Sequence, residues 1–417
     1  MAQLAEGWPR DATGSTSASE VGGAAMNPFG APGVGNYTTD GSSGGSAAAL
    51  SAGLAVVGTG SDTGGSIQGP ASANNVVGIR SPLGAIPEEG ELPSFYKQDA
   101  PGPMARRARD AVLMFDVLAK TNYYPSVSKK RNLAGQKLCY FNIFEPVPQP
   151  PPAPLPPNFI VDPEALALTN RAIEILRAAG ATVERVIPTD PMAALMFLQT
   201  QVMPRFLGMS AARTTCLTAC EAWSWDTYFA DPTRFGPGSP VRSAKDIAAS
   251  PLLHPDFKAR LNEAINNPGG LSYEAYCKQK CDVEAKYDEQ RTELQSALRA
   301  LLASGGNCSA FISPTWSFFP FNQSQAGITP LEFGPTVMGP YAGWPSVVVP
   351  MGFSTPTAAA PKGLPLGLDI IGPPERFRGM LEVAVVFQDR LTLVTNPPGT
   401  PLTKADPRQY NVHFCSP

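Results

Sequence analysis

The strongest constraint on this sequence lies in residues 40–81, where two clusters of glycine and serine flank a run of small apolar residues. The clusters are residues 41–46 and 63–66, and residues 47–57 between them are expected to form one short buried helix. The strand-like residues 76–79 follow the second cluster. A flexible linker is also rich in glycine and serine, but it does not enclose an apolar helix. The spacing therefore predicts that both serine clusters return to one place.

Both clusters supply groups that a nucleophilic site needs. Glycine allows backbone N–H groups to approach a ligand closely. A serine hydroxyl becomes a nucleophile when a neighbouring group removes its proton. The stretch is therefore the candidate catalytic site of the chain.

The motifs of this stretch resemble the amidase signature family. The family pattern is a GGSSGGS cluster, a small-residue helix, then G-[TS]-D-x-G-G-S-I-R-x-P and a V-x-G-[IL]-[KR]-P strand. The matching segments are residues 41–46, 60–70 and 77–82. Residues 98–106 are similar to the family's D-x-x-G-P-[MI]-A-R stretch. The resemblance extends more loosely over most of residues 27–388.

The resemblance implies an α/β fold, the amidase-signature fold, in which a mixed twisted β-sheet is covered by helices on both faces. We expect a single amidase-like domain over residues 1–417 that lacks the family's N-terminal part. Within it, residues 146–157 are expected to form a proline-rich loop and residues 191–304 a mostly helical region that shapes the substrate pocket. Residues 397–417 are expected to form a peripheral tail.

The resemblance also implies the roles of individual residues. By position, Ser66 resembles the acyl-accepting nucleophile, and Ser42, preceded by a cis peptide bond, resembles the bridging serine that relays its proton. The backbone N–H groups that resemble the family's oxyanion hole are those of Thr63, Gly64, Gly65 and Ser66. The residues that resemble supporting positions, which hydrogen-bond the loops, are Ser43, Ser46 and Asp62. No cofactor and no metal is expected at this site.

Three positions depart from the family pattern. The family's catalytic lysine lies several tens of residues before the first serine cluster, whereas the first lysine of this chain is Lys97. Arg10 is the only cation upstream, and a guanidinium keeps its proton, so it cannot serve as the base. Either Met1 is not the true start or the protein has lost its base. The other departures are Gln68 in place of arginine, which makes an anionic substrate less expected, and Asp40 in place of glycine.

The sequence therefore predicts an amidase-type hydrolase that cleaves a carboxylic amide to an acid and ammonia or an amine through an acyl-Ser66 intermediate. Because no lysine matches the family's base, the chain as given is expected to be weakly active or inactive. The alternative is an inactive amidase-like binding or scaffold protein. The substrate stays open among small aliphatic amides, aryl or indole acetamides, fatty amides and glutamine.

Two rival catalytic motifs are less convincing. Residues 41–45 also fit the G-x-S-x-G elbow of α/β-hydrolases, but no buried apolar strand precedes them. The only histidines are His254 and His413, which we interpret as surface or packing residues. The S-x-x-K matches at residues 94–97 and 126–129 are interpreted as chance.

The composition of the chain limits the classes of binding partner that we expect. The net charge of −3 and the pI of about 5.6 give no indication of nucleic acid or an anionic membrane as a partner. No run reaches the ~18 apolar residues of a membrane span, and no secretory signal is visible. The expected partner is a small-molecule amide substrate, and a homodimer stays open as an assembly.

The seven cysteines are an odd number, which favours free, mostly buried thiols in a reducing compartment. We therefore expect a cytoplasmic location. Cys216 and Cys220 are one helical turn apart, as are Cys277 and Cys281, so packing on helix faces is expected. A four-thiolate metal site and two bridged helices stay as alternatives.

Sequence patterns also predict several elements outside the serine clusters. Helices are expected over residues 108–120, from an N-cap at Asp162 to a stop at Gly180, and over residues 282–304. The last of these carries an apolar stripe of Val283, Tyr287, Leu294, Leu298 and Leu301. Strands are expected over residues 137–142 and 182–187.

Overall fold

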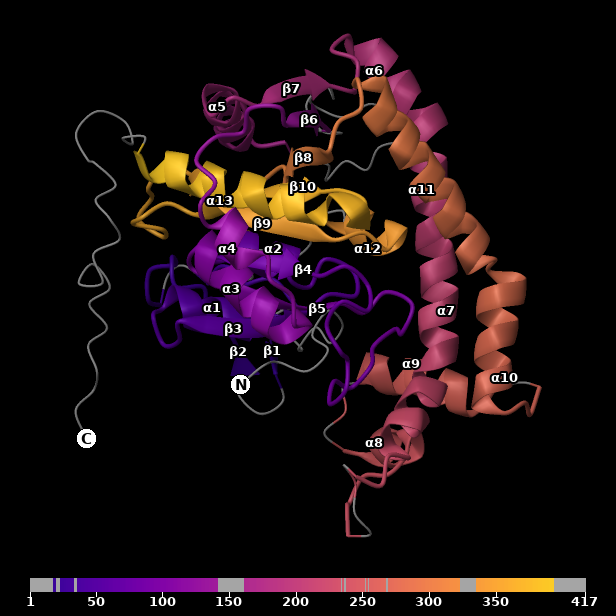
Figure 1. Ribbon diagram of the computed structural model, residues 1–417. Coiled ribbons are helices and arrows are strands. Elements are labelled where there is room, and N and C mark those ends of the chain that lie inside the picture. The colour runs from indigo at the N-terminus through magenta and orange to yellow at the C-terminus, as the bar shows by residue number, and fades with distance from the viewer. Residues whose placement is uncertain are drawn as a thin grey trace, which may run out of the picture.

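The fold is built on a central eight-stranded β-sheet, seen in the computed structural model in Figure 1. The structure describes residues 18–19, 23–33, 36–141, 161–233, 235, 238–251, 253, 255–267, 269–322 and 335–393. In spatial order the strands are β3 (Val57–Ser61), β5 (Pro101–Ala105), β4 (Val77–Arg80), β9 (Ser346–Phe353), β10 (Pro365–Ile371), β8 (Ala310–Pro314), β6 (Lys137–Tyr140) and β7 (Thr182–Arg185). Neighbouring strands are antiparallel, except that β6 is parallel to both β8 and β7. A separate pair, β1 (Ala18–Ser19) and β2 (Gly23–Ala24), lies near the N-terminus.

Helices cover both faces of the sheet, as expected for this α/β fold. On one face lie α3 (Ala108–Ala119), α5 (Pro163–Ala178) and α13 (Phe377–Leu393), with the short α4 (Tyr124–Val127) beside them. On the other lie α1 (Gly44–Ser51), α2 (Gln68–Ala73) and α12 (Pro335–Ala342). Side chains of strand β9 point alternately to the two faces of the sheet. Val347 and Val349 pack in the core on the first face, whereas Val348 packs in the core on the second. The mixed sheet with two helical layers confirms the predicted fold class.

A set of helices runs along one edge of the molecule, on the right in Figure 1. It consists of α7 (Met203–Phe229), α10 (Tyr273–Lys278), the π-helical η2 (Gln279–Glu284) and α11 (Tyr287–Ser304), which we call the helical arm. The preceding helices are α6 (Pro191–Phe197) and the π-helical η1 (Leu198–Val202). Helices α8 (Ala244–Ala249) and α9 (Pro255–Ile265) pack at its lower end. The 3-10 turn η3 (Pro374–Arg376) precedes α13.

Local sequence signals fix several of these elements. The Asp162 side chain accepts a hydrogen bond from the Glu164 N–H at 2.8 Å, which caps α5 as predicted. Gly180 follows the helix with a φ of +102°, a conformation that favours glycine and reverses the chain into β7. The helix predicted over residues 108–120 and the strand predicted over residues 137–142 are also present, as α3 and β6.

Two predicted helices were too long. The helix expected over residues 47–57 ends at Ser51, and Val57 instead begins β3. The helix expected over residues 282–304 begins only at Tyr287, because a π-helical turn precedes it. Val283 is therefore 69% exposed rather than part of the buried stripe, whereas Leu294 and Leu298 are buried.

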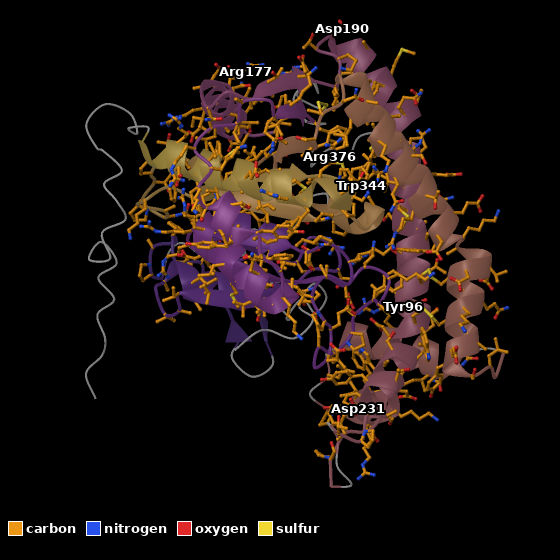
Figure 2. The ribbon with its side chains drawn as sticks, in the orientation of Figure 1. Tyr96, Arg177, Asp190, Asp231, Trp344 and Arg376 are labelled. Atoms are coloured by element: carbon orange, nitrogen blue, oxygen red, sulfur yellow. A yellow bond between two sulfur atoms is a disulfide. The ribbon has the colours of Figure 1, made fainter. Side chains whose placement is uncertain are left out.

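The cysteines form three disulfides, so the prediction of free thiols was wrong. Cys216 bonds to Cys281 and Cys220 to Cys277, which joins α7 to η2 and α10, with the sulfur atoms drawn in Figure 2. Cys216 pairs with Cys281 and Cys220 with Cys277, which is the pattern expected when two antiparallel helices face each other and each carries two cysteines one turn apart. A third disulfide, from Cys139 to Cys308, joins β6 to the segment before β8. The odd count was misleading because the seventh cysteine, at position 415, lies outside the described residues.

These disulfides remove the reason for expecting a cytoplasmic location. That expectation depended on free thiols, and disulfides persist mainly in oxidising compartments. The helical pairs of cysteines also leave no four-thiolate metal site. Within the described ranges no group of three or more His, Cys, Asp and Glu side chains could hold a metal ion.

Other expectations fall partly beyond the description. No described helix combines the length and the apolar character needed to cross a membrane. The proline-rich residues 146–157, the tail over residues 397–417, His254 and His413 all lie outside the described residues.

The two nested disulfides of the helical arm should stabilise the fold in a non-additive way. They close loops of 65 and 57 residues, and either one alone keeps the loop closed. We expect Cys216→Ala with Cys281→Ala, or Cys220→Ala with Cys277→Ala, to lower the free energy of unfolding by about 1 kcal/mol through lost packing. Removing all four cysteines should cost about 4 kcal/mol more than the sum of the two, because the loop then opens. Urea unfolding under non-reducing conditions measures these differences.

The disulfide from Cys139 to Cys308 is the control, because it closes a much longer loop of 169 residues that the arm disulfides leave open. Its removal should therefore carry its own loop-closure cost alone. Strict additivity of the two arm disulfides would contradict this account.

Candidate active site

The two serine clusters meet, as their spacing predicts. The Ser43 N–H, at the start of α1, donates a hydrogen bond to the backbone oxygen of Ser66 at 3.1 Å. The Gly41–Ser42 peptide bond is cis, as the family resemblance implied. Ser42 and Ser66 are partly exposed, and their hydroxyls form no hydrogen bond within the described part of the chain. Both hydroxyls are thus accessible on adjoining loops.

The first loop is held by backbone and side-chain contacts around Ser43. The Ser43 hydroxyl accepts a hydrogen bond from the Ser61 N–H at 3.2 Å and lies 3.3 Å from the Ser61 oxygen. A Cβ at Gly60 would lie 2.6 Å from the Ser43 Oγ, so this approach requires glycine. Asp40 has a φ of +58°, which explains why the family has glycine there and why aspartate, tolerated in this region, can replace it. Its carboxylate accepts from the Gly41 N–H at 2.7 Å.

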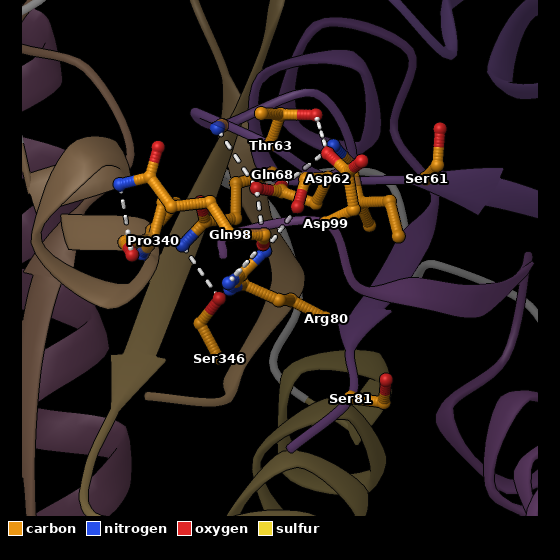
Figure 3. Close-up of polar contacts among 12 residues, drawn as sticks. Ser61, Asp62, Thr63, Gln68, Arg80, Ser81, Gln98, Asp99, Pro340 and Ser346 are labelled. Atoms are coloured by element: carbon orange, nitrogen blue, oxygen red, sulfur yellow. Dashed lines mark hydrogen bonds and ion pairs between the residues drawn. The ribbon is translucent and has the colours of Figure 1, made fainter. Parts of the chain in front are cut away.

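The second loop is organised by Asp62, which is fully buried. Its carboxylate accepts hydrogen bonds from the Gly65 N–H at 2.9 Å and the Ile67 N–H at 2.8 Å. Arg80, also fully buried, forms an ion pair with the same carboxylate at 3.1 Å and donates to the Asp62 backbone oxygen. Figure 3 shows the two side chains pointing toward each other below the loop. Arg80 therefore holds both the side chain and the backbone oxygen of Asp62, the residue that precedes the loop.

Arg80 also connects the loop to two more distant segments. Its Nη2 donates to the Gln98 backbone oxygen at 2.8 Å, and its Nε donates to the Trp344 backbone oxygen at 3.2 Å. Arg80 matches the [KR] position of the family's V-x-G-[IL]-[KR]-P motif, but that match did not indicate this role. A buried arginine so fully occupied positions the loop and is not free for a substrate.

The predicted set of oxyanion donors needs one correction. The Gly65 N–H is bonded to Asp62 and therefore does not face a ligand, although Gly65 has the φ of +111° that only glycine adopts easily. The N–H groups of Thr63, Gly64 and Ser66 form no hydrogen bond within the described residues. Three of the four predicted donors thus stay available to a developing oxyanion.

A buried carboxyl holds the side of the loop that carries Thr63. The Thr63 hydroxyl donates to the Asp99 carboxylate at 2.5 Å, which Figure 3 shows, and Asp99 also accepts from the N–H groups of Ser94 and Phe95 at 2.9 and 2.8 Å. Burial raises the pKa of Asp99, although these hydrogen bonds oppose the shift. Burial, and to a smaller extent the negative charge of Asp99, also raises the pKa of Glu91 to about 7. Part of the negative charge beside the loop therefore titrates near neutral pH.

Gln68 carries no information about the substrate, contrary to the sequence interpretation. Its side chain is fully buried, and its Nε2 donates to the Ser346 hydroxyl at 2.5 Å and to the Asp369 carboxyl at 3.2 Å. An arginine at this position would lie against Asp369 rather than against a ligand. Burial, followed by the charge of Asp62, raises the pKa of Asp369 well above its ordinary value. With glutamine in place of arginine, Asp369 has a neutral partner.

This raised pKa of Asp369 should make stability depend on pH. The folded chain keeps a proton that the unfolded chain releases above about pH 4, so the free energy of unfolding falls as pH rises from there toward the folded pKa. Asp369→Asn, which mimics the neutral carboxyl, should remove that fall, worth about 1.4 kcal/mol for each unit of the pKa shift. Urea unfolding of both proteins at pH 5 and pH 8 tests this. Identical pH dependence in the two would contradict it.

The remaining candidate positions differ in what surrounds them. Ser46 lies in the first turn of α1, and its hydroxyl forms no hydrogen bond within the described residues, so it does not hold the loops as Ser43 and Asp62 do. Lys97, the first lysine, forms ion pairs with Asp282 at 2.7 Å and Asp288 at 2.8 Å on the helical arm. Its ammonium group thus joins the arm to the core.

One residue at the site had no signal in the sequence. Arg213, on α7, lies against Gly64: a Cβ on this glycine would be 2.8 Å from the Arg213 Nη2. Arg213 is 147 positions from Ser66 in a region that matched no motif, so only the packing of the helical arm could reveal it.

Comparison with known proteins gives a family. A family model described as Amidase matches residues 8–376. The A subunit of glutamyl-tRNA(Gln) amidotransferase from Hyphomonas neptunium is 25% identical over 408 residues, which cover 93% of this chain and 74% of that protein. Its counterpart from Marinobacter nauticus is 44% identical over 108 residues, which span only 26% of this chain and 22% of that relative.

Solved structures share the fold. Peptide amidase PAM, in complex with the competitive inhibitor chymostatin, is 24% identical with a TM-score of 0.68, over 95% of this chain and 75% of that one. The glutamyl-tRNA(Gln) amidotransferase A subunit of Thermotoga maritima is 23% identical with a TM-score of 0.57, over 90% and 70% of the two chains.

Proposed function

The chain belongs to the amidase family, and from that premise we propose that it is an amidohydrolase that cleaves a carboxylic amide to an acid and ammonia or an amine. The observation that supports this most is the hydrogen bond between the Ser43 N–H and the Ser66 oxygen, because it brings the cis-linked Ser42 beside the loop of Ser66. Peptide amidase and the amidotransferase relatives are named for chemistry at amides.

In the proposed reaction, the Ser66 Oγ attacks the amide carbonyl carbon and forms an ester bond while its proton passes to Ser42. The charge on the carbonyl oxygen is stabilised by the free N–H groups of Thr63, Gly64 and Ser66. The C–N bond breaks, and Ser42 returns a proton to the leaving nitrogen. Water then hydrolyses acyl-Ser66 to the acid and restores the serine.

In the family's mechanism a lysine accepts the proton that the bridging serine relays. No residue of this sequence matches the family's lysine, and Lys97 is bound to two carboxylates of the helical arm. The second candidate is an amidase-like protein that binds an amide without turnover. Both candidates share the small-molecule amide as partner.

The disulfides add a proposal about location. Three disulfides in a chain of this length fit maturation in an oxidising compartment better than in the cytoplasm.

A fluorophosphonate probe tests the nucleophile directly, because it forms a covalent bond with an activated serine. We expect mass spectrometry to locate the label on Ser66 and Ser66→Ala to abolish it. Ser42→Ala should slow labelling roughly 10²- to 10⁴-fold, the usual value of a proton relay. Ser126→Ala, which removes an exposed hydroxyl on α4 outside the loops, is the matched control and should label like the parent chain.

The same assay separates the two candidate functions. Labelling of Ser66 that Ser42→Ala slows supports the enzyme. A folded chain whose Ser66 never reacts would exclude turnover and leave the binding protein.

A further inference from the structure

Arg213 introduces a positive charge next to the proposed oxyanion loop. The residue is half-buried on α7, and a Cβ on Gly64 would lie 2.8 Å from its Nη2 and 3.2 Å from its Cζ. The guanidinium therefore lies against the backbone of Gly64. Because the Gly64 N–H is one of the free donors of this loop, Arg213 is within reach of a ligand bound there.

The orientation of Arg213 is fixed from behind by Gln98. The Arg213 Nε donates to the Gln98 Oε1 at 3.0 Å, and the Gln98 Nε2 donates to the Pro340 oxygen at 3.2 Å. Gln98 is fully buried, and Figure 3 shows its side chain reaching toward Pro340. With the Nε edge occupied, the two Nη groups are the part of Arg213 left for a ligand.

The charge of Arg213 has no carboxylate partner among the described residues. Burial raises the pKa of Tyr287, and the positive charges of Arg291, Arg213 and Arg80 oppose this shift. Arg291 also contacts the Tyr287 ring directly. Of these three arginines, Arg80 alone forms an ion pair with a carboxylate of the described residues, whereas Arg291 donates to the Lys97 oxygen and the Tyr287 hydroxyl. Arg213 therefore brings to this edge of the loop a positive charge that no described carboxylate contacts.

We propose that Arg213 binds a carboxylate of the substrate, so that the preferred amides carry an acid group a few bonds from the amide carbonyl, as in the monoamide of a dicarboxylic acid. An unpaired guanidinium with two free Nη groups matches a carboxylate in a planar, bidentate way. Asp62 and Asp99 cannot take this place, because each is already held by backbone or side-chain donors. The inference rests on the proposed function, since it concerns the same site.

The test compares glutaramate with pentanamide, its neutral counterpart, as protectants of Ser66 against the fluorophosphonate probe. We expect glutaramate to protect at a concentration roughly tenfold to a hundredfold lower, the usual gain from hydrogen bonds to a charged group. Arg213→Met should remove this difference, and Arg213→Lys should keep only part of it. Arg205→Met, which removes a charge two turns earlier on α7, should leave the difference unchanged.

A second variant keeps the test decisive if Arg213→Met does not fold. Gly64→Ala places a Cβ against the end of the flexible Arg213 side chain, which can move away, so the fold should survive and the preference for glutaramate should fall. Equal protection by the two amides, or a preference that survives Arg213→Met, would overturn the inference. Arg213→Met that slows labelling without changing the ratio would also overturn it, because the guanidinium would then act on the oxyanion.

Failure of the proposed function gives a different result. If Ser66 never reacts, calorimetric titration of the chain with each amide still measures the preference. Tighter binding of glutaramate that is lost in Arg213→Met supports the carboxylate site in a binding protein, and equal or absent binding of both amides overturns it.

Discussion

The candidate site depends on the buried ion pair between Asp62 and Arg80. The two carboxylate oxygens of Asp62 accept hydrogen bonds from the N–H groups of Gly65 and Ile67, and the Arg80 guanidinium neutralises that carboxylate. Breaking such a pair by removing one partner typically costs about 3–5 kcal/mol, because the other charge stays buried alone. The same pair determines which N–H groups stay free, since Asp62 takes that of Gly65. The geometry of the donors is thus set by a charge pair below the loop.

From this ion pair, contacts continue outward to the helical arm. Arg80 binds the backbone of Gln98, and the Gln98 side chain binds Arg213 on α7. The disulfide at Cys216, one turn beyond Arg213, ties α7 to η2. The helical arm therefore contributes Arg213 to the site in addition to packing against the core. Its covalent closure limits how far Arg213 can move away from the loop.

The spacing of the serine clusters predicted that they meet, and the resemblance to the amidase signature family implied the fold class. The predictions that failed concern features that are determined by packing between segments far apart in the sequence. Nothing in the spacing of Cys216 and Cys220 distinguishes packing from disulfides until the antiparallel partner helix is known. The substitution at Gln68 suggested a change at the substrate, yet the side chain faces Asp369 in the core. Arg213 carried no signal because no local pattern records which helix covers a distant loop.

The central claim is that Ser66 accepts the acyl group and that N–H groups of its loop hold the oxyanion. A crystal structure of the chain reacted with a small alkyl boronic acid tests this most directly, because the tetrahedral boronate imitates the intermediate. The account predicts a covalent bond to the Ser66 Oγ, with a boronate oxygen about 2.7–3.1 Å from N–H groups among Thr63, Gly64 and Ser66 but not Gly65. A bond to another residue, or a boronate oxygen that no N–H of this loop contacts, would contradict it.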